Sequence, residues 1–178
     1  MHAIILVGLA RSGKDTAADF LAKKFHYKKF VFSDFLAAEL KKKKVPLSKH
    51  NLSVFGDELR KKNGMAAVAG LLWKKAKKFK KIVLVGARSV EEINYVKKKC
   101  KNTFVAAITA PVSKRFARRS SRDPKTRKDF LARDKRDIRN KGLNNALKLA
   151  DFTLQNNGTV RELREKILKL ALKLEKNI

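Results

Sequence analysis

The chain is poor in the residues that build disulfides and metal centres. Its 178 residues include one cysteine, Cys100, and three histidines. A single cysteine excludes an intrachain disulfide, so nothing in the composition points to an oxidising compartment. The three histidines are scattered and lack the ligand spacing of a zinc site. These absences argue against disulfide-stabilised secreted proteins and against zinc-cluster proteins.

Long apolar runs are absent as well. The longest early run, Ala3–Ala10, is too short for a membrane helix, and no basic segment precedes it. We therefore expect neither a signal peptide nor a membrane partner, and a cytoplasmic location. Hydrophobic residues make up 44% of the chain and charged residues 34%, which is typical of a folded protein. The length suits one domain, 1–178, with a full core.

Acidic residues are also scarce. Sixteen Asp and Glu residues stand against 45 Lys and Arg residues, so the formal net charge is +29. Such a field attracts phosphates of any kind, including those of nucleic acid. Most of the excess is lysine in short clusters, a pattern typical of solvated helix faces. No aromatic-basic RNA motif accompanies it. We favour a solvated surface and keep nucleic acid as an alternative partner. Nothing here indicates an oligomeric state.

Short apolar runs alternate with helical periods along the chain. Five runs predict strands: Ala3–Val7, Phe30–Phe32, Ile82–Val85, Phe104–Ile108 and Phe152–Leu154. Helices are predicted over Lys14–Phe25, Ser33–Lys44, Asn51–Lys62, Met65–Phe79, from Ser89, over Pro111–Ser121, Thr126–Arg139, Leu143–Ala150, and from Thr159. Ser33 and Ser89 are predicted N-caps, with Glu92 as the capping-box partner of Ser89. This alternation predicts a three-layer α/β domain with a parallel sheet and helices on both faces.

In such sheets, ligands bind beyond the carboxyl ends of the strands. The prediction places the residues Gly8–Thr16, Asp34, Arg88 and the segment after Ala110 along that one edge. These are also the most conspicuous polar and glycine-rich parts of the chain.

The stretch GLARSGKDT has the form of a phosphate-binding loop. Gly8 and Gly13 allow the backbone to curl so that amides point at phosphate oxygens, and the following helix adds its positive end. Lys14 would reach the outer phosphates and neutralise the departing phosphoryl group. The predicted ATP-binding residues are Gly8, Leu9, Ala10, Arg11, Ser12, Gly13, Lys14, Asp15 and Thr16. The alternative is an ordinary glycine-rich turn with a solvated lysine.

One position departs from the usual loop. A hydroxyl residue normally follows the lysine and binds Mg²⁺, but this chain has Asp15 there. Asp15 could bind the metal or its water shell, or Thr16 could take over. The sequence leaves both open.

The loop and the alanine-rich helix after it resemble small P-loop kinases of the nucleoside monophosphate kinase group. The stretches VFSDFLAAEL, DELRKKNGMAAVA, VGARSVEEINYVKK and RDPKTRKDFLARDKRDIRNKGLNNALKLADFTLQNNGT resemble, in this order, an archaeal group of nucleotide kinases related to dephospho-CoA kinase. The likeness covers nearly the whole chain. It implies a P-loop NTPase fold with strand order 2-3-1-4-5, an acceptor-binding helical region at about 34–80 and a lid at about 112–140. One departure is Val85, where relatives tend to carry an Mg²⁺-positioning Asp.

The resemblance assigns an acceptor side to the site. Asp34 could orient or deprotonate an acceptor oxygen, or simply be a helix N-terminal charge. Arg60 and Arg88 could hold an acceptor phosphate through paired donors, although each alone could be a surface cation. The acceptor would be a nucleoside monophosphate or dephospho-CoA, and ATP with Mg²⁺ would be the cofactors.

Residues 114–127 carry arginine where the rest of the chain prefers lysine, which suggests a need for planar forked donors. The resembling kinases place their lid here, so Arg118 and Arg122 are predicted to act in catalysis and Arg119 to bind nucleotide. The alternative is an RNA-facing or solvated basic helix. Arg133 belongs to the same predicted unit.

The resembling kinases also place the loop after the last strand beside the base. Asn156 and Gly158 are therefore predicted to bind nucleotide, or else to form an ordinary turn with Thr159 as a helix N-cap. Trp73 is predicted to be a core residue. The whole pattern predicts an ATP-dependent kinase of small phosphate-bearing molecules. The rival interpretation is a nucleic-acid-associated P-loop ATPase or RNA-binding protein.

Overall fold

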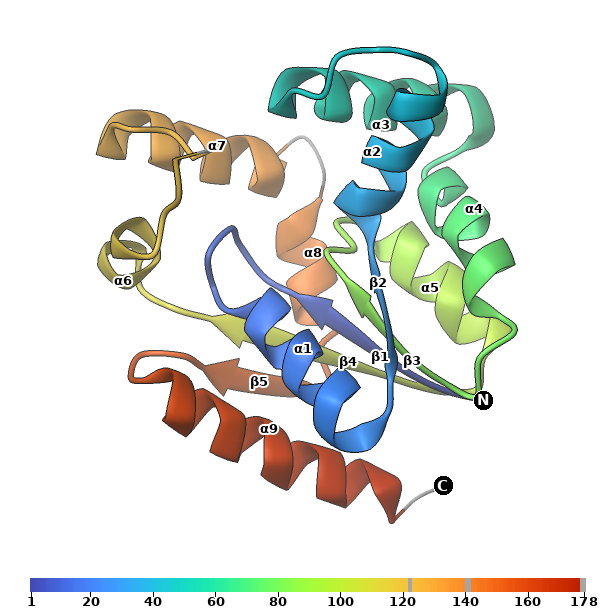
Figure 1. Cartoon of the computed structure of the whole chain (residues 1–178), viewed down its shortest axis with the longest axis vertical. Helices are drawn as coiled ribbons and strands as arrows, with labels where there is room; N and C mark the ends of the chain where they lie inside the picture. The colour runs from blue at the N-terminus through green and yellow to red at the C-terminus, as the bar shows by residue number, and fades with distance from the viewer. Residues whose placement is uncertain (122, 140–141, 177–178) are drawn as a thin grey trace.

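The computed structural model describes residues 1–121, 123–139 and 142–176. Its centre is one parallel sheet of the order β2-β3-β1-β4-β5, which confirms the predicted fold and strand order (Figure 1). The strands are β1 (His2–Val7), β2 (Lys28–Val31), β3 (Lys81–Val85), β4 (Asn102–Thr109) and β5 (Phe152–Gln155). Strand β1 lies in the middle of the sheet, with β3 on one side and β4 on the other. From β1 the chain goes to one side of the sheet, and after β3 it crosses to the other side. In parallel sheets, ligands bind at the carboxyl end of the strands where the connections diverge in this way.

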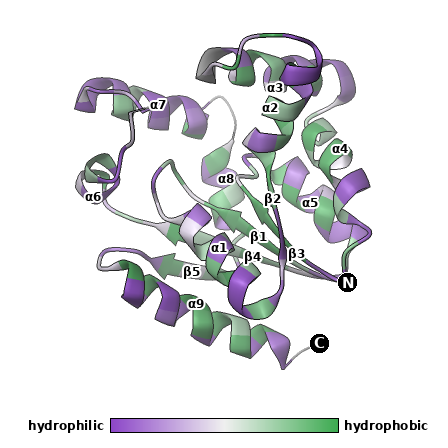
Figure 2. Ribbon diagram, viewed as in Figure 1, coloured by the Kyte–Doolittle hydropathy of each residue, from purple (hydrophilic) through white to green (hydrophobic). Residues whose placement is uncertain are grey.

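Helices cover both faces of this sheet. The helices of the described residues are α1 (Lys14–Phe25), α2 (Phe32–Lys42), α3 (Lys49–Asn63), α4 (Ala67–Ala76), α5 (Val90–Lys99), α6 (Val112–Ala117), α7 (Arg127–Arg139), α8 (Leu143–Lys148) and α9 (Val160–Glu175). Helices α1 and α9 pack on one face, and α4, α5 and α8 pack on the other. Hydropathy follows this layering, with apolar strands inside and polar outer helix faces (Figure 2). No described helix is long and apolar enough to cross a membrane.

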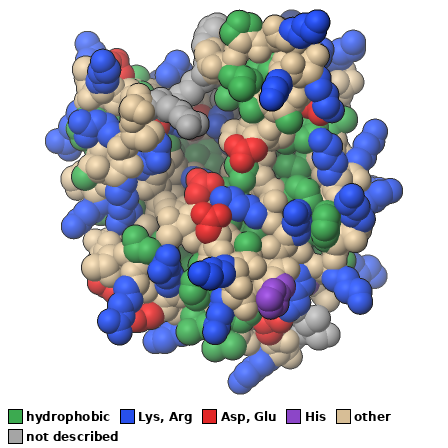
Figure 3. Space-filling view, viewed as in Figure 1, with side chains coloured by type: hydrophobic (Ala, Val, Ile, Leu, Met, Phe, Trp, Pro, Cys, Tyr) green, Lys and Arg blue, Asp and Glu red, His purple; other side chains and the backbone are tan. Residues whose placement is uncertain are grey.

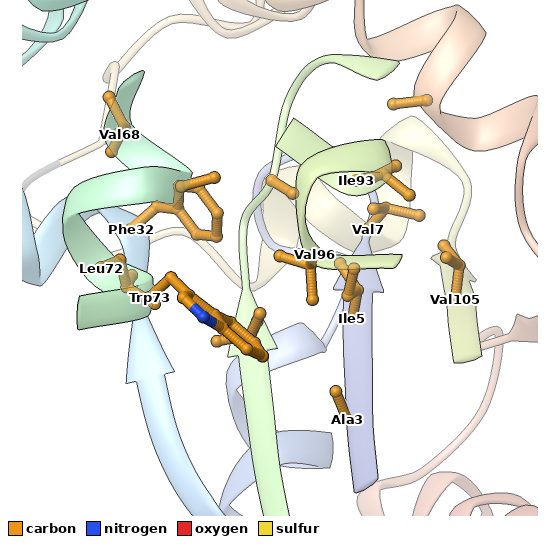
Figure 4. Close-up of a cluster of buried hydrophobic side chains, with 14 of the residues drawn as sticks. Ala3, Ile5, Val7, Phe32, Val68, Leu72, Trp73, Ile93, Val96 and Val105 are labelled. Atoms are coloured by element: carbon orange, nitrogen blue, oxygen red, sulfur yellow. The ribbon is translucent and has the colours of Figure 1, made fainter. Parts of the chain in front are cut away.

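Strand β1 is buried on both faces, as its continuous apolar run predicts. Ile4 and Leu6 face the α1–α9 layer, whereas Ala3, Ile5 and Val7 face the other layer. Figure 4 shows the second cluster, in which Trp73 of α4 packs with apolar side chains from the sheet and from α5. Trp73 is 8% exposed and is a core residue, as predicted.

Several predicted boundaries were wrong. The second strand ends at Val31 rather than Phe32, and α4 covers Ala67–Ala76 rather than Met65–Phe79. Helix α2 begins at Phe32 with Val31 as its N-cap, so the predicted N-cap Ser33 is the second residue of the helix. The reason is that Phe32 is buried in the core as a helical residue, so the chain leaves β2 earlier. The helix predicted to reach Ser121 is α6, which ends at Ala117. Its continuation is replaced by a turn in which the amide of Ser120 donates to Asp123.

Candidate functional site

The phosphate-binding loop connects β1 to α1 and requires its glycines. Gly8 has φ 148° and Gly13 has φ 108°, values that side-chain-bearing residues rarely adopt. A Cβ atom on Gly8 would lie 2.3 Å from the carbonyl oxygen of Ile108, and one on Gly13 would lie 2.4 Å from Nδ2 of Asn156. The loop is therefore pressed against β4 and against the loop that follows β5.

Lys14 lies at the beginning of α1 with its ammonium turned back over the loop. Its Nζ donates to the carbonyl oxygens of Gly8 at 2.7 Å and Leu9 at 2.8 Å. Burial lowers the pKa of Lys14 to about 8. Asp15 and Asp137 oppose this shift, while Arg88 and Arg133 add to it. Charged residues after β3 (Arg88) and on α7 (Arg133 and Asp137) thus influence the pKa of the predicted phosphate-binding lysine.

Ser12 provides the test of whether this loop suits a phosphate. The residue is 1% exposed, and its Oγ has no hydrogen-bond partner among the residues that the structure describes. A buried hydroxyl without a partner is costly and calls for an explanation. Inside a glycine-rich loop beside an ammonium group, an oxygen-rich anion would satisfy it. The residues present fit a bound polyphosphate.

The two candidate metal residues differ in their surroundings. The Asp15 side chain is 71% exposed, and its carboxylate lies 3.4 Å from Nζ of Lys29 on β2. Thr16 is half-buried in the first turn of α1. Asp15 thus faces solvent and Lys29, whereas Thr16 is partly enclosed in the first turn of the helix.

The predicted acceptor residues Arg60 and Arg88 lie together around one carboxylate. Glu92 is fully buried, and its Oε1 accepts from Nη2 of Arg60 at 2.7 Å. Its Oε2 accepts from the backbone amide of Arg88 at 2.8 Å. Ser89 caps α5 as predicted, but Glu92 reaches Arg88 instead of closing the predicted capping box. The same carboxylate thus pairs with Arg60 and with the backbone of Arg88.

The side chain of Arg88 reaches across the site to α7. Its Nη1 lies 3.3 Å from Oδ1 of Asp137. Asp34, the third predicted acceptor residue, is in the first turn of α2 and lines a cavity of about 340 Å³ beside β2. Lys29, Lys75 and four apolar residues form the rest of its lining. In the described part of the chain, no hydrogen bond or ion pair joins Asp34 to Arg60 or Arg88.

Arg115 ties the lid segment to the phosphate-binding loop. Its guanidinium is 2% exposed and makes a paired contact with Asp134 of α7, at 3.1 and 2.6 Å. It also donates to the carbonyl oxygens of Ala110 and Ala10. The fork of an arginine matches this set of acceptors, which a lysine could not satisfy. The local switch from lysine to arginine thus has a structural cause at this position.

Arg118 joins the lid segment to the loop after β5. Its Nη2 donates to the carbonyl oxygens of Asn156 at 3.1 Å and Gly158 at 3.2 Å. Asn156 is buried and donates from Nδ2 to the carbonyl oxygen of Ser12 at 2.8 Å. Arg118, predicted to act in catalysis, and the predicted nucleotide residues Asn156 and Gly158 are therefore connected to the phosphate-binding loop.

The other two predicted lid arginines differ. Arg119 is exposed, and its guanidinium lies 4.1 Å from the centroid of the Phe116 ring. Arg122 lies outside the described residues.

Three aspartates of the lid segment have structural contacts that were not predicted from the sequence. Asp123 accepts from Nε of Arg11 at 2.6 Å and from Nη1 of Arg133 at 2.8 Å, so it links the phosphate-binding loop to α7. Asp134 and Asp137 are buried on the same face of α7 as Phe130. The spacing 130, 134 and 137 is that of a buried helical stripe. Because Asp134 and Asp137 share the helical spacing of the apolar Phe130, the sequence alone could have predicted that they are buried and paired with basic residues.

Seen from outside, the site is a hollow between two lobes. Figure 3 shows it between the part that carries α7 and the part that carries α2 and α3, with acidic side chains near its centre and many lysines and arginines around it. This hollow lies over the carboxyl edge of the sheet.

Comparisons with known proteins agree with this geometry. Residues 7–139 match the AAA domain family. The UPF0200 protein of Pyrococcus horikoshii is 31% identical over 184 residues, which is 98% of both chains. The chain belongs to the UPF0200 family. A UPF0200/UPF0201 protein of Archaeoglobus fulgidus is 34% identical, and the chain spans 57% of its length.

The fold itself matches that of solved kinases. The shikimate kinase of Acinetobacter baumannii superposes with a TM-score of 0.62 at 21% identity, over 97% of this chain and 94% of that one. This member of the UPF0200 family therefore has a P-loop kinase-like fold. The finer relation to dephospho-CoA kinase rests on the sequence stretches alone.

Proposed function

We propose that the chain is an ATP-dependent kinase that transfers the γ-phosphoryl group to a small phosphate-bearing acceptor. The observation that carries this proposal is the loop of residues 8–16. In it the Oγ of Ser12 has no partner among the described residues, and the half-buried Lys14 turns its ammonium back over the loop. Arg60 and Arg88, held together by Glu92, supply a second cationic position beyond the end of β3. A kinase whose acceptor carries a phosphate would use two such positions, one to orient each substrate.

Each residue has a defined part in the proposed transfer. The loop amides and Lys14 would hold the β- and γ-phosphates, and Arg88 would draw the acceptor into line. The acceptor oxygen forms a bond to the γ-phosphorus as the bond to the bridging oxygen breaks, which releases ADP. If the acceptor is a hydroxyl, Asp34 would take its proton. Bound Mg²⁺ would neutralise charge on the phosphoryl oxygens, with Thr16 as its loop residue.

Nucleotide binding is tested with one substitution. We expect MgATP to raise the melting temperature of the wild type, and we expect Lys14→Ala, which removes the ammonium, to lose this stabilisation. Equal stabilisation of the variant and the wild type would contradict the assignment of the loop.

The acceptor is tested with radiolabelled ATP against a panel of nucleoside monophosphates and dephospho-CoA. Arg60 and Arg88 favour an acceptor that carries a phosphate, and we expect one of these two classes to become labelled. Arg88→Ala should raise the KM for that acceptor while ATP binding is kept. Intact ATP binding without any labelled product would argue against a metabolic kinase.

A nucleic-acid-associated ATPase is the second candidate, because the net charge of +29 attracts any polyphosphate. Against it, Arg115, Arg118 and Arg133 are engaged in internal contacts. RNA-stimulated ATP hydrolysis without transfer to a small acceptor would favour this candidate. In that case Arg88→Ala should reduce the salt dependence of RNA binding by about one unit of slope.

A further inference from the structure

The strand end that faces the phosphate-binding loop carries no carboxylate. Val85 closes β3, directly beside Leu6 of β1, and is 2% exposed in an apolar cluster. Mg²⁺ in phosphoryl-transfer sites is usually held by one or two protein carboxylates together with phosphate oxygens and water. In the described residues, no three His, Cys, Asp or Glu side chains gather into a metal cage. Any such carboxylate must therefore come from another element.

Helix α7 brings a carboxylate to the same position. Asp137 contacts Arg88, which lies three residues after Val85, at 3.3 Å from Oδ1 to Nη1. Its side chain is 12% exposed. Asp137 is also one of the few charges that act on the ammonium of Lys14. Asp137 thus contacts a residue that follows the end of β3 and acts electrostatically on the phosphate-binding lysine.

Two other acidic residues are less suitable. Asp15 is the second carboxylate that acts on Lys14, but it is exposed and paired with Lys29. Asp134 shares the buried face of α7, yet both of its oxygens accept from Arg115. The helix is also held at a defined position, because Arg115 and the Arg11–Asp123–Arg133 contacts connect it to the phosphate-binding loop.

We propose that Asp137 supplies, from the lid helix, the carboxylate for the Mg²⁺ of the bound nucleotide that β3 lacks in this chain. This inference rests on the proposed function, since it requires ATP in the loop. Binding of MgATP would then exchange the contact of Asp137 with Arg88 for one with the metal or its water. Arg88 would at the same moment become available to the acceptor phosphate. Metal binding and acceptor binding are thereby coupled through one ion pair.

The test compares ATP binding with and without metal in Asp137→Asn. Removal of a negative charge beside the triphosphate should leave metal-free ATP binding in EDTA unchanged or tighter. The gain in affinity on addition of Mg²⁺ should fall by about tenfold or more, the usual cost of losing one metal ligand or its support. Calorimetry measures both, and the EPR signal of free Mn²⁺ gives the metal affinity of the ATP complex directly. Asp129→Asn is the matched control, because Asp129 is exposed on the same helix and should change neither quantity.

A conservative variant keeps the test decisive if Asp137→Asn folds poorly. Asp137→Glu retains the carboxylate and should retain most of the Mg²⁺-dependent gain. An unchanged Mg²⁺-dependent gain in Asp137→Asn would overturn the inference, and so would an equal loss of metal-free and metal-dependent binding. Absence of any ATP binding by the wild type would instead overturn the proposed function.

Discussion

Individual residues of the site combine charge with burial, and Lys14 is the clearest case. Its pKa of about 8 means that the free protein begins to lose this proton near physiological pH. A bound triphosphate stabilises the protonated form, so it raises the pKa again. The affinity for nucleotide should therefore decline as the pH rises through about 8.

The linked proton gives a direct measurement. At pH 8.5 the free lysine is largely neutral and the bound one charged, so we expect ATP binding to take up a proton. At pH 6.5 both states are charged and Lys14 should contribute no uptake. Calorimetry in two buffers of different ionisation enthalpy measures this difference. Uptake that is equal at the two pH values, or that persists at pH 8.5 in Lys14→Met, would contradict the role of Lys14.

Arg115 forms a buried ion pair with Asp134, and we expect this pair to be important for stability. Arg115→Met leaves the Asp134 carboxylate buried without its paired donors, so we expect a loss of about 3–5 kcal/mol in the free energy of unfolding. Urea denaturation measures it. Arg119→Met is the matched control, because Arg119 is exposed on Phe116, and it should cost less than about 1 kcal/mol. In Arg115→Met/Asp134→Leu, part of the loss should be regained, and a purely additive result would argue against the pair.

At the scale of elements, the site depends on loops that belong to different parts of the chain. The loop after β5 reaches the phosphate-binding loop through Asn156, whose Nδ2 donates to the carbonyl oxygen of Ser12. The same residue accepts from Arg118 of the lid segment. One buried amide thus connects β5, the phosphate-binding loop and the segment after α6.

Asn156→Ala should therefore affect both folding and binding. We expect a loss of about 1–3 kcal/mol in stability, since a buried carbonyl loses its donor, and weaker ATP binding because the loop is no longer held. Hydrogen exchange of the amides of residues 8–13 should become faster. Asn157→Ala changes the exposed neighbour and should have little effect on any of the three measurements. Comparable effects of the two substitutions would show that the connection through Asn156 is unimportant.

At the scale of the whole molecule, the net charge of +29 acts against the compact state. Like charges repel more strongly when the chain is folded, and salt screens them, because the Debye length falls from about 30 Å at 0.01 M to about 8 Å at 0.15 M. We expect the melting temperature to rise with sodium chloride over this range, as measured by differential scanning fluorimetry. A melting temperature that falls with salt would mean that surface ion pairs outweigh the repulsion.

Much of the architecture was predictable because it depends on local pattern. The apolar run of β1, the glycine spacing around Lys14 and the alternation of strands with helices are visible in the sequence, and right-handed crossovers leave few topologies. The strand order followed from the resemblance to known kinases. The misplaced start of α2 shows the limit of local rules. The burial of Phe32 decided that boundary against the capping preference of Ser33.

What the sequence determined by itself is therefore the fold class and the phosphate-binding loop, since both are encoded within short windows. The tertiary structure alone decided the pairing of charges: Arg115 with Asp134, Arg60 with Glu92, and Arg88 with Asp137. With 45 basic and 16 acidic residues, each carboxylate has many possible partners along the chain. The packing of α5 on the sheet and of α7 against α6 and α8 brings these partners within contact distance. It buries the Arg115 and Arg60 pairs, where the Coulomb interaction is strong.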